Sequence, residues 1–402
     1  MKGFFAAVLA SAASSVLAAP SPVENGPITA RAAAAACATP VTLTGNPFSG
    51  RKIYANKFYS SEVISAASAI SDPALATAAA KVANVGTFLW IFPDTISDTR
   101  DKISVVEDGI KDVPCGEIAA LVIYDLPGRD CAAKASNGEL PVGSVNTYKT
   151  EYIDPIVAIF KKYPNTAIAL VIEPDSLPNL VTNINLQTCK DSAAGYREGV
   201  AYALKQLNLP NIAMYIDAGH GGWLGWNDNL KPGAKELATV YKNAGSPKQV
   251  RGIATNVAGW NQWDLSPGEF SKASDAQYNK AQNEKLYIEL FSPELKSAGM
   301  PGQAIVDTGR NAVSGLRQEW GNWCNINGAG FGVRPTTTTG STLVDSFVWV
   351  KPGGESDGTS DTSANRYDSF CGKSESFKPS PEAGQWNQAY FEMLVKNAKP
   401  AF

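Results

Sequence analysis

The sequence predicts an α/β barrel whose strands run parallel. Short apolar runs recur along the chain, and helical patterns lie between them, which is the alternation typical of a parallel sheet. A doubly wound open sheet shows the same alternation, but it gathers its polar groups at one crevice. We favour the barrel because polar residues follow nearly every run. There are about seven or eight runs, at 53–54, 87–92, 119–124, 167–172, 212–216, 253–257, 304–306 and 347–350.

The helical patterns fall between these runs. Residues 152–163 place their apolar side chains at helical spacing on one face. The Ala-rich segment 64–85 is also expected to be helical, with an interruption near Pro73. Further helices are expected at 194–207, 235–243, 278–296 and 385–397.

Residues 167–177, AIALVIEPDSL, carry the first chemical signal. A continuous apolar run fits a strand buried on both faces, and Pro174 ends it. Two carboxyl groups, Glu173 and Asp175, therefore stand at the carboxyl end of a strand, where barrels carry their catalytic residues. A partly desolvated carboxyl group keeps its proton at higher pH, so Asp175 is our candidate general acid. The alternative is that both residues cap the next helix or hold a loop.

Composition excludes several classes of function. The chain has 402 residues, enough for one large barrel or two medium domains, and its formal net charge of -3 argues against a nucleic-acid partner. No cluster of Lys or Arg suggests a membrane surface. His220 is the only histidine, which excludes a His-rich metal site and leaves proton transfer to carboxylates. We expect no metal and no cofactor.

The beginning of the chain is typical of a secretory signal. Residues 1–18 combine Lys2, an apolar core and a small-residue cleavage site, and they are too short for a membrane anchor. Residues 19–40 are expected to be a leader, and 41–402 one catalytic domain without a carbohydrate-binding module. We expect a secreted monomer. Six cysteines fit an oxidising compartment, and their spacing alone does not choose their pairing.

Three carboxylates and several tryptophans suggest work on a sugar chain. Asp130, Asp175 and Asp357 each follow a predicted strand, and cleavage of a glycosidic bond needs one acid and one base or nucleophile. Indole rings suit the lining of a sugar site. We favour this role for Trp90, Trp223, Trp226 and Trp323, and we expect Trp349 and Trp386 to be core residues.

The chain resembles the glycoside hydrolase family 6 cellulases, especially the fungal cellobiohydrolases, from about Asn46 to its end. The resemblance rests on six segments: YDLPGRDCAAKASNGE, LVIEPDSLPNLVTN, AMYIDAGHGGWLGW, IATNVAGW, WCNINGAGFG and VWVKPGGESDGTSD. It implies a distorted seven-stranded barrel that hydrolyses β-1,4-glucan with inversion.

The resemblance also implies roles for single residues. Asp175 matches the proton donor, and Asp130 matches the aspartate that raises the pKa of the donor. Asp357 matches a proposed base, with a water chain past Ser136 to Asp130 as the other route. Tyr124 matches the tyrosine beneath the distorted sugar. Substrate-binding positions are Trp90, Asp94, His220, Trp223, Asn256, Trp323, Lys351 and Glu355.

The same resemblance pairs Cys131 with Cys189 and Cys324 with Cys371. Cys37 and Cys115 remain, and we predict that they pair.

Two long loops bear on the mode of attack. Segments 129–145 and 353–381 have nearly the full length found in cellobiohydrolases of the family, which implies a roofed tunnel and release of cellobiose from non-reducing chain ends. Cellulose chains and cello-oligosaccharides are then the partners. The alternatives are an endo-acting β-1,4-glucanase of the family, a non-catalytic glucan-binding barrel, and a metal-dependent phosphoesterase.

Overall fold

The computed structural model describes residues 35–91 and 102–402. The predicted signal peptide, most of the predicted leader and Asp94 lie outside these residues. None of the helices in the described part is long and apolar enough to cross a membrane.

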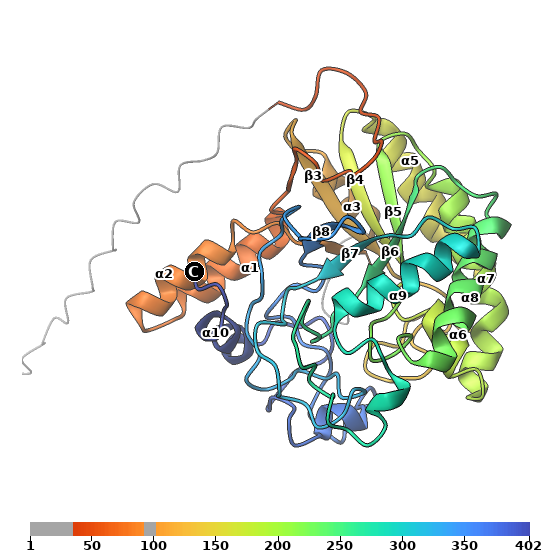
Figure 1. Cartoon of the computed structure of the whole chain (residues 1–402). Coiled ribbons are helices and arrows are strands. Elements are labelled where there is room, and N and C mark those ends of the chain that lie inside the picture. The colour runs from red at the N-terminus through yellow and green to blue at the C-terminus, as the bar shows by residue number, and fades with distance from the viewer. Residues whose placement is uncertain (1–34, 92–101) are drawn as a thin grey trace, which may run out of the picture. The chain divides into compact units, whose positions relative to one another are not determined.

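The centre of the fold is one sheet of eight parallel strands (Figure 1). Its spatial order is β1-β3-β4-β5-β6-β7-β8, and β2 also pairs with β3. Since β4 occupies one edge of β3, β1 and β2 share the other edge in successive halves. The sheet therefore has seven positions, as the barrel expectation required. The strands are β1 (Lys52–Ile53), β2 (Leu89–Ile91), β3 (Glu117–Ile123), β4 (Ala167–Ile172), β5 (Ile212–Asp217), β6 (Val250–Thr255), β7 (Gln303–Asp307) and β8 (Val344–Val348).

The sheet curls into a distorted barrel rather than a regular one. Among the described residues no ladder joins β8 to the β1/β2 edge. Two single hydrogen bonds span that gap instead: Phe88 N–H donates to Trp349 O at 3.0 Å, and Trp90 Nε1–H donates to Val350 O at 2.8 Å. The second bond fixes the indole of Trp90 at the seam.

The two faces of the sheet have different cores. The inner face carries small residues in register, because Ala120 pairs with Ala169 and Ala169 with Ala213. These alanines leave room inside the barrel for the buried rings of Phe48 and Tyr215, which lie 6.2 Å apart. Larger residues on the outer face pack against the helices, and together they form the main core.

Helices surround the sheet, and α1, α2 and α10 form a separate group beside it (Figure 1). The α-helices of the described residues are α1 (Lys57–Ser68), α2 (Pro73–Val82), α3 (Lys102–Ile110), α4 (Val145–Thr147), α5 (Asp154–Lys162), α6 (Leu177–Thr182), α7 (Gln187–Gln206), α8 (Asn227–Asn243), α9 (Glu284–Ser297) and α10 (Gln388–Lys396).

Several helix boundaries differ from the prediction because of local capping. The helix expected from residue 278 begins as α9 at Glu284, where the side chain of Asn283 accepts from Leu286 N–H at 2.8 Å. The helix expected from residue 385 begins as α10 at Gln388. Trp386 precedes it and forms an isolated bridge with Glu355.

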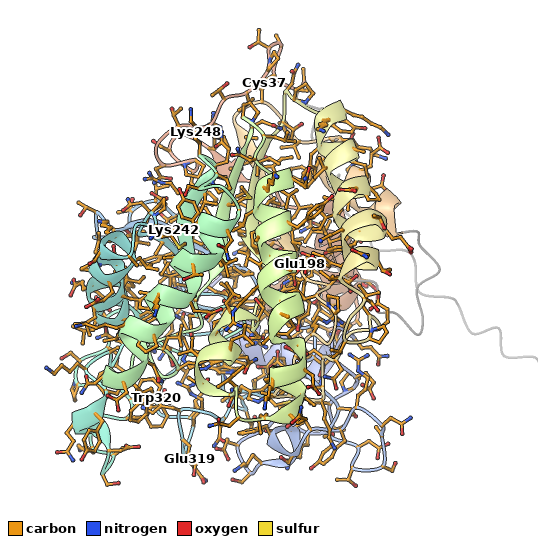
Figure 2. All side chains as sticks on the ribbon, turned by 90° about the vertical axis from the view of Figure 1, so that its right-hand side faces the viewer. Cys37, Glu198, Lys242, Lys248, Glu319 and Trp320 are labelled. Carbon is orange, nitrogen blue, oxygen red and sulfur yellow. A yellow bond between two sulfur atoms is a disulfide. The ribbon has the colours of Figure 1, made fainter. Side chains whose placement is uncertain are left out.

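The first described residues run along the amino ends of the strands. Val41 N–H donates to Pro164 O and Leu43 N–H to Pro210 O, just before β4 and β5. The disulfide between Cys37 and Cys115 fixes this segment to the residues before β3. Cys37 therefore lies at the opposite end of the molecule from Trp320 (Figure 2).

Candidate active site

A cavity of about 490 Å³ lies beyond the carboxyl ends of the strands. It gathers side chains that are far apart in the sequence, which is the arrangement expected of a barrel enzyme. The predicted site residues that line it are Trp90, Tyr124, Asp130, Ser136, Asp175, His220, Trp223, Trp323, Lys351, Glu355 and Asp357.

Asp175 reaches the cavity through an unusual turn after β4. Glu173 and Asp175 have φ angles of 48° and 60°, a backbone conformation that side-chain-bearing residues rarely adopt and that clusters at functional sites. Burial raises the pKa of the Asp175 carboxyl well above its ordinary value. The neighbouring carboxyl groups of Asp130, Asp217 and Asp357 raise it further. This carboxyl is thus suited to hold a proton near neutral pH.

Glu173 has the structural role that we weighed as the alternative for both acids. Its carboxylate accepts from Asp125 N–H at 3.1 Å, from Leu126 N–H at 3.3 Å and from the Tyr148 hydroxyl at 2.8 Å. These bonds hold the backbone just after β3. Burial raises the pKa of Glu173 to about 7, and the three donors oppose that rise.

Asp130 lies at the start of the first long loop, where neighbouring side chains donate hydrogen bonds to its carboxylate. Tyr124 Oη–H donates to Asp130 Oδ2 at 2.6 Å. Burial raises the pKa of Asp130, while hydrogen bonds from Ser136 and Tyr124 lower it. The nearby guanidinium of Arg129 lowers it too, and that group lies 4.4 Å from the centre of the Tyr124 ring. Because these donors and this cation oppose the effect of burial, the pKa of Asp130 rises less than that of a carboxyl group that is only buried. Asp130 can therefore exchange a proton more readily than such a group.

Asp357 is held in an ion pair. Nη1 of Arg310 donates to both carboxylate oxygens at 2.9 Å, and Asn325 N–H donates to Oδ2 at 2.8 Å. Both side chains are more than nine-tenths buried. Three hydrogen bonds from two groups hold the Asp357 carboxylate, so loss of its charge would leave the buried Arg310 cation without its partner.

Aromatic rings form much of the cavity wall. Trp90 and Tyr124 meet edge to face at 5.1 Å, and the Lys351 ammonium lies 5.8 Å from the Trp90 ring. On another part of the wall, Trp223 Nε1–H donates to Thr182 Oγ1 at 2.7 Å. The peptide oxygen of Trp323 accepts from the indole of Trp260 at 2.9 Å. These bonds fix the rings in place before any ligand arrives.

The two long loops contact each other over the cavity. Lys134 N–H, in the first loop, donates to Asp368 Oδ2 at 2.9 Å in the second. Arg366 Nε–H donates back to Ala135 O at 3.1 Å. We call these two bonds the loop clasp. The disulfides Cys131–Cys189 and Cys324–Cys371 tie one loop each to the barrel, so all three disulfides match the pairs we expected.

The comparison with known proteins agrees with this geometry. Residues 48–398 match the family described as Glycosyl hydrolases family 6.

The chain belongs to this family.

The similarity extends over nearly the whole chain. The 1,4-beta-D-glucan cellobiohydrolase CEL6C of Podospora anserina is 63% identical over 397 residues, 98% of this chain and 98% of the relative. A relative from Fusarium oxysporum with an endoglucanase type B name is 50% identical over 367 residues, 89% of this chain and 77% of the relative. Among solved structures, a variant of the cellobiohydrolase Cel6A from Humicola insolens in complex with methyl-tetrathio-α-D-cellopentoside has a TM-score of 0.84 and 47% identity. That match covers 90% of this chain and 100% of that chain.

Two predicted binding residues of this family 6 chain do not line the cavity. Trp226 directly precedes α8, and its indole N–H donates back to Gly222 O at 2.8 Å. Asn256 is fully buried, and its amide exchanges two hydrogen bonds with the backbone of Asn261, at 3.0 and 3.1 Å. Asn256 therefore stands one layer behind the wall, where it shapes the loop that carries Asn261.

Two residues of the site were absent from the prediction: Asp217, which is buried next to Asp175 and does not line the cavity, and Trp320, which does line it. Asp217 accepts from Asp175 N–H at 3.0 Å, and burial raises the pKa of Asp217 to about 7. Its place at the end of β5 was a usable signal. Trp320 lies in the cavity wall, with the centre of its ring 4.5 Å from that of Phe270. In the described part of the chain, no group of His, Cys, Asp and Glu side chains is arranged to hold a metal ion.

Proposed function

We propose that this chain is a secreted, inverting cellulase that hydrolyses β-1,4-glucosidic bonds and releases cellobiose from non-reducing chain ends. The observation that carries the proposal is the Asp175 carboxyl, which lies in an aromatic-lined cavity among three other carboxyl groups, where burial and the neighbouring carboxyl groups raise its pKa. Relatives named as cellobiohydrolases support the substrate.

The positions of a proton donor and a proton acceptor in the site support inversion. Asp175 gives its proton to the leaving glycosidic oxygen while water attacks the opposite face of the sugar. The attacking water loses a proton, which passes along water past Ser136 to Asp130. One proton therefore leaves Asp175 and one reaches Asp130, so the charge of this buried pair is the same before and after the reaction. Moving charge within the pair avoids creating a second uncompensated charge there.

Asp357 is the other candidate base, and its contacts speak against it. Taking a proton would cost it the ion pair with Arg310, which leaves a buried cation without its partner. In the proposed mechanism Asp357 stays ionised, and its negative charge helps to stabilise the positive charge that develops on the sugar ring. Asp357→Asn then reduces kcat without moving the pH dependence that belongs to Asp130.

The loop clasp supports attack at chain ends. A roofed cavity admits a chain end more easily than the middle of a chain, and it hinders release between successive cuts. The second candidate is endo attack, which the Fusarium oxysporum relative's name favours. An opening of the clasp would permit it.

Product analysis tests both points at once. NMR of fresh cellohexaose digests should show cellobiose with the α-anomer formed first, since inversion converts a β-linkage into an α-hemiacetal. The β-anomer first would contradict inversion. Early cellotriose and longer products from cellulose would favour the endo reading, and the absence of any product from fully folded enzyme would favour a glucan-binding barrel.

Secretion and a monomeric state complete the proposal. Three disulfides support an oxidising compartment. The protein in the culture medium should start after about residue 18, at the end of the predicted signal. Sedimentation should give the mass of a single chain. Accumulation inside the cell, or a larger assembly, would contradict these two points.

A further inference from the structure

The single histidine stands in the cavity wall with one ring nitrogen already engaged. His220 Nδ1 accepts from Gly222 N–H at 3.1 Å, and Nδ2 of Asn261 lies 3.1 Å from the same nitrogen. Nε2 has no partner among the described residues, and the side chain lines the cavity. The state of Nδ1 thus decides what His220 offers to a ligand.

The orientation of the Asn261 amide follows from its other neighbours. Arg317 can only donate, and its Nη2 lies 2.7 Å from one amide atom of Asn261, which must therefore be the oxygen. The opposite amide atom is the nitrogen, and it also donates to Glu284 Oε1 at 2.8 Å. Because this nitrogen faces Nδ1 with its hydrogens, Nδ1 has to act as an acceptor.

The surrounding parts are themselves fixed. Arg317 is paired with Glu269 at 2.6 Å and is buried. Glu284 Oε1 also accepts from Gly221 N–H at 2.9 Å, next to the histidine. Asn256 holds the backbone of Asn261, as described above. Rotating the Asn261 amide would set its oxygen against the Glu284 oxygen and its nitrogen against a guanidinium, which loses both bonds.

We propose that Asn261 is a positioning residue that fixes His220 as the Nε2–H tautomer, a permanent hydrogen-bond donor to a glucosyl hydroxyl in the cavity. The role of this donor toward sugar rests on the function proposed above. The tautomer itself rests only on the contacts of Asn261.

The charges around the ring favour the neutral form. Burial, together with the nearby Arg317 cation, lowers the pKa of His220 to about 3. The other titratable groups packed on this loop are Asp217, which accepts from Gly219 N–H, Tyr287, whose hydroxyl donates to Ala218 O, and Glu284. The Asn261 amide lies between Glu284 and the histidine ring, and its nitrogen donates to Glu284 Oε1.

NMR of the full protein carrying ¹⁵N-labelled histidine tests the tautomer directly. The chain has one histidine, so the long-range ¹H–¹⁵N spectrum needs no assignment. We expect a protonated Nε2, an unprotonated Nδ1 and no titration between about pH 4 and 8. A protonated Nδ1, or a titration near the ordinary value of 6.5, would overturn the proposal.

Asn261→Asp gives the test a functional arm. The substitution places a carboxyl oxygen opposite both Nδ1 and Glu284 Oε1. The two carboxyl groups then share one proton and keep one negative charge beside Nδ1, so His220 should take its proton there and begin to titrate. Above the new pKa, Nε2 loses its hydrogen. KM for cello-oligosaccharides should then rise about tenfold with pH, the equivalent of one hydrogen bond, while KM of the wild type shows no such step.

Asn211→Asp is the matched control. Asn211 is also buried and donates to two peptide oxygens, at 3.2 and 2.8 Å, at the amino end of β5. It should lower stability without changing the histidine spectrum or the pH profile of KM.

An unchanged spectrum and KM profile in Asn261→Asp would refute the positioning role. If Asn261→Asp does not fold, the wild-type spectrum decides alone. If the wild type folds but hydrolyses nothing, the proposed function fails while the spectrum still tests the tautomer.

Discussion

Opening the loop clasp should shift the proposed attack at chain ends toward internal cuts. Asp368→Asn is the sharpest perturbation, because only one of two bonds is lost. Oδ1 of Asp368 accepts from Phe370 N–H at 3.0 Å, and an asparagine oxygen can keep that bond. Its amide nitrogen would face Lys134 N–H, and two donors cannot bond to each other.

The size of the effect follows from that lost bond. A hydrogen bond to a charged acceptor is worth about 1.5–3 kcal/mol, and partial exposure of this one lowers it to about 1–2 kcal/mol. That energy corresponds to a five- to thirtyfold larger open fraction of the clasp, by order of magnitude. The Arg366 bond to Ala135 remains, so the loops stay connected on one side.

The assay is the loss of carboxymethylcellulose viscosity per reducing end released. We expect this ratio to rise severalfold in Asp368→Asn. Asp361→Asn is the control, because Asp361 belongs to the same loop and, among the described residues, its carboxylate bonds only to Ser363. If both variants fold and share the wild-type ratio, the clasp does not govern the mode of attack.

Three further predictions follow from single side chains. Asp175→Asn should abolish hydrolysis while cello-oligosaccharides still bind, as titration calorimetry can show; wild-type turnover would remove Asp175 from its role. Trp223→Ala should raise KM about tenfold or more through lost stacking area, with Trp223→Phe intermediate, and equal KM values would argue against stacking. Glu173 has a folded-state pKa raised from 4.5 to about 7, so its contribution to stability is fully present below about pH 4.5 and is lost as pH rises through 7. Urea unfolding should show up to roughly 3 kcal/mol lost over that window, and less in Glu173→Gln; an equal loss in both would contradict the assignment.

Much of the fold was predictable because its signals are local. The run of residues 167–172 is apolar throughout and stops at a proline, so β4 lies where the pattern predicted it. Alternation of strands and helices gave the parallel order for the same reason. Helix starts were less predictable, because they depend on capping residues such as Asn283. The spacing of apolar residues does not show whether such a side chain will form its capping hydrogen bond.

The site was predictable where one strand end supplies one residue, and less so where partners come from distant segments. Asp357 was visible as a carboxylate, but its pairing with Arg310, 47 positions away, is a tertiary contact. Trp223 and Trp226 have the same glycine-rich surroundings in the sequence. Only the start of α8 separates them, because it turns Trp226 back onto Gly222.

The proposed mechanism depends most on the proton of Asp175, and an infrared difference spectrum measures that proton. The spectrum of the wild type minus that of Asp175→Asn at neutral pH isolates this one group from the other buried acids. We predict a positive carbonyl band of a protonated carboxylic acid. A positive carboxylate band in its place would mean that Asp175 is ionised in the resting enzyme, and it would contradict the role of general acid.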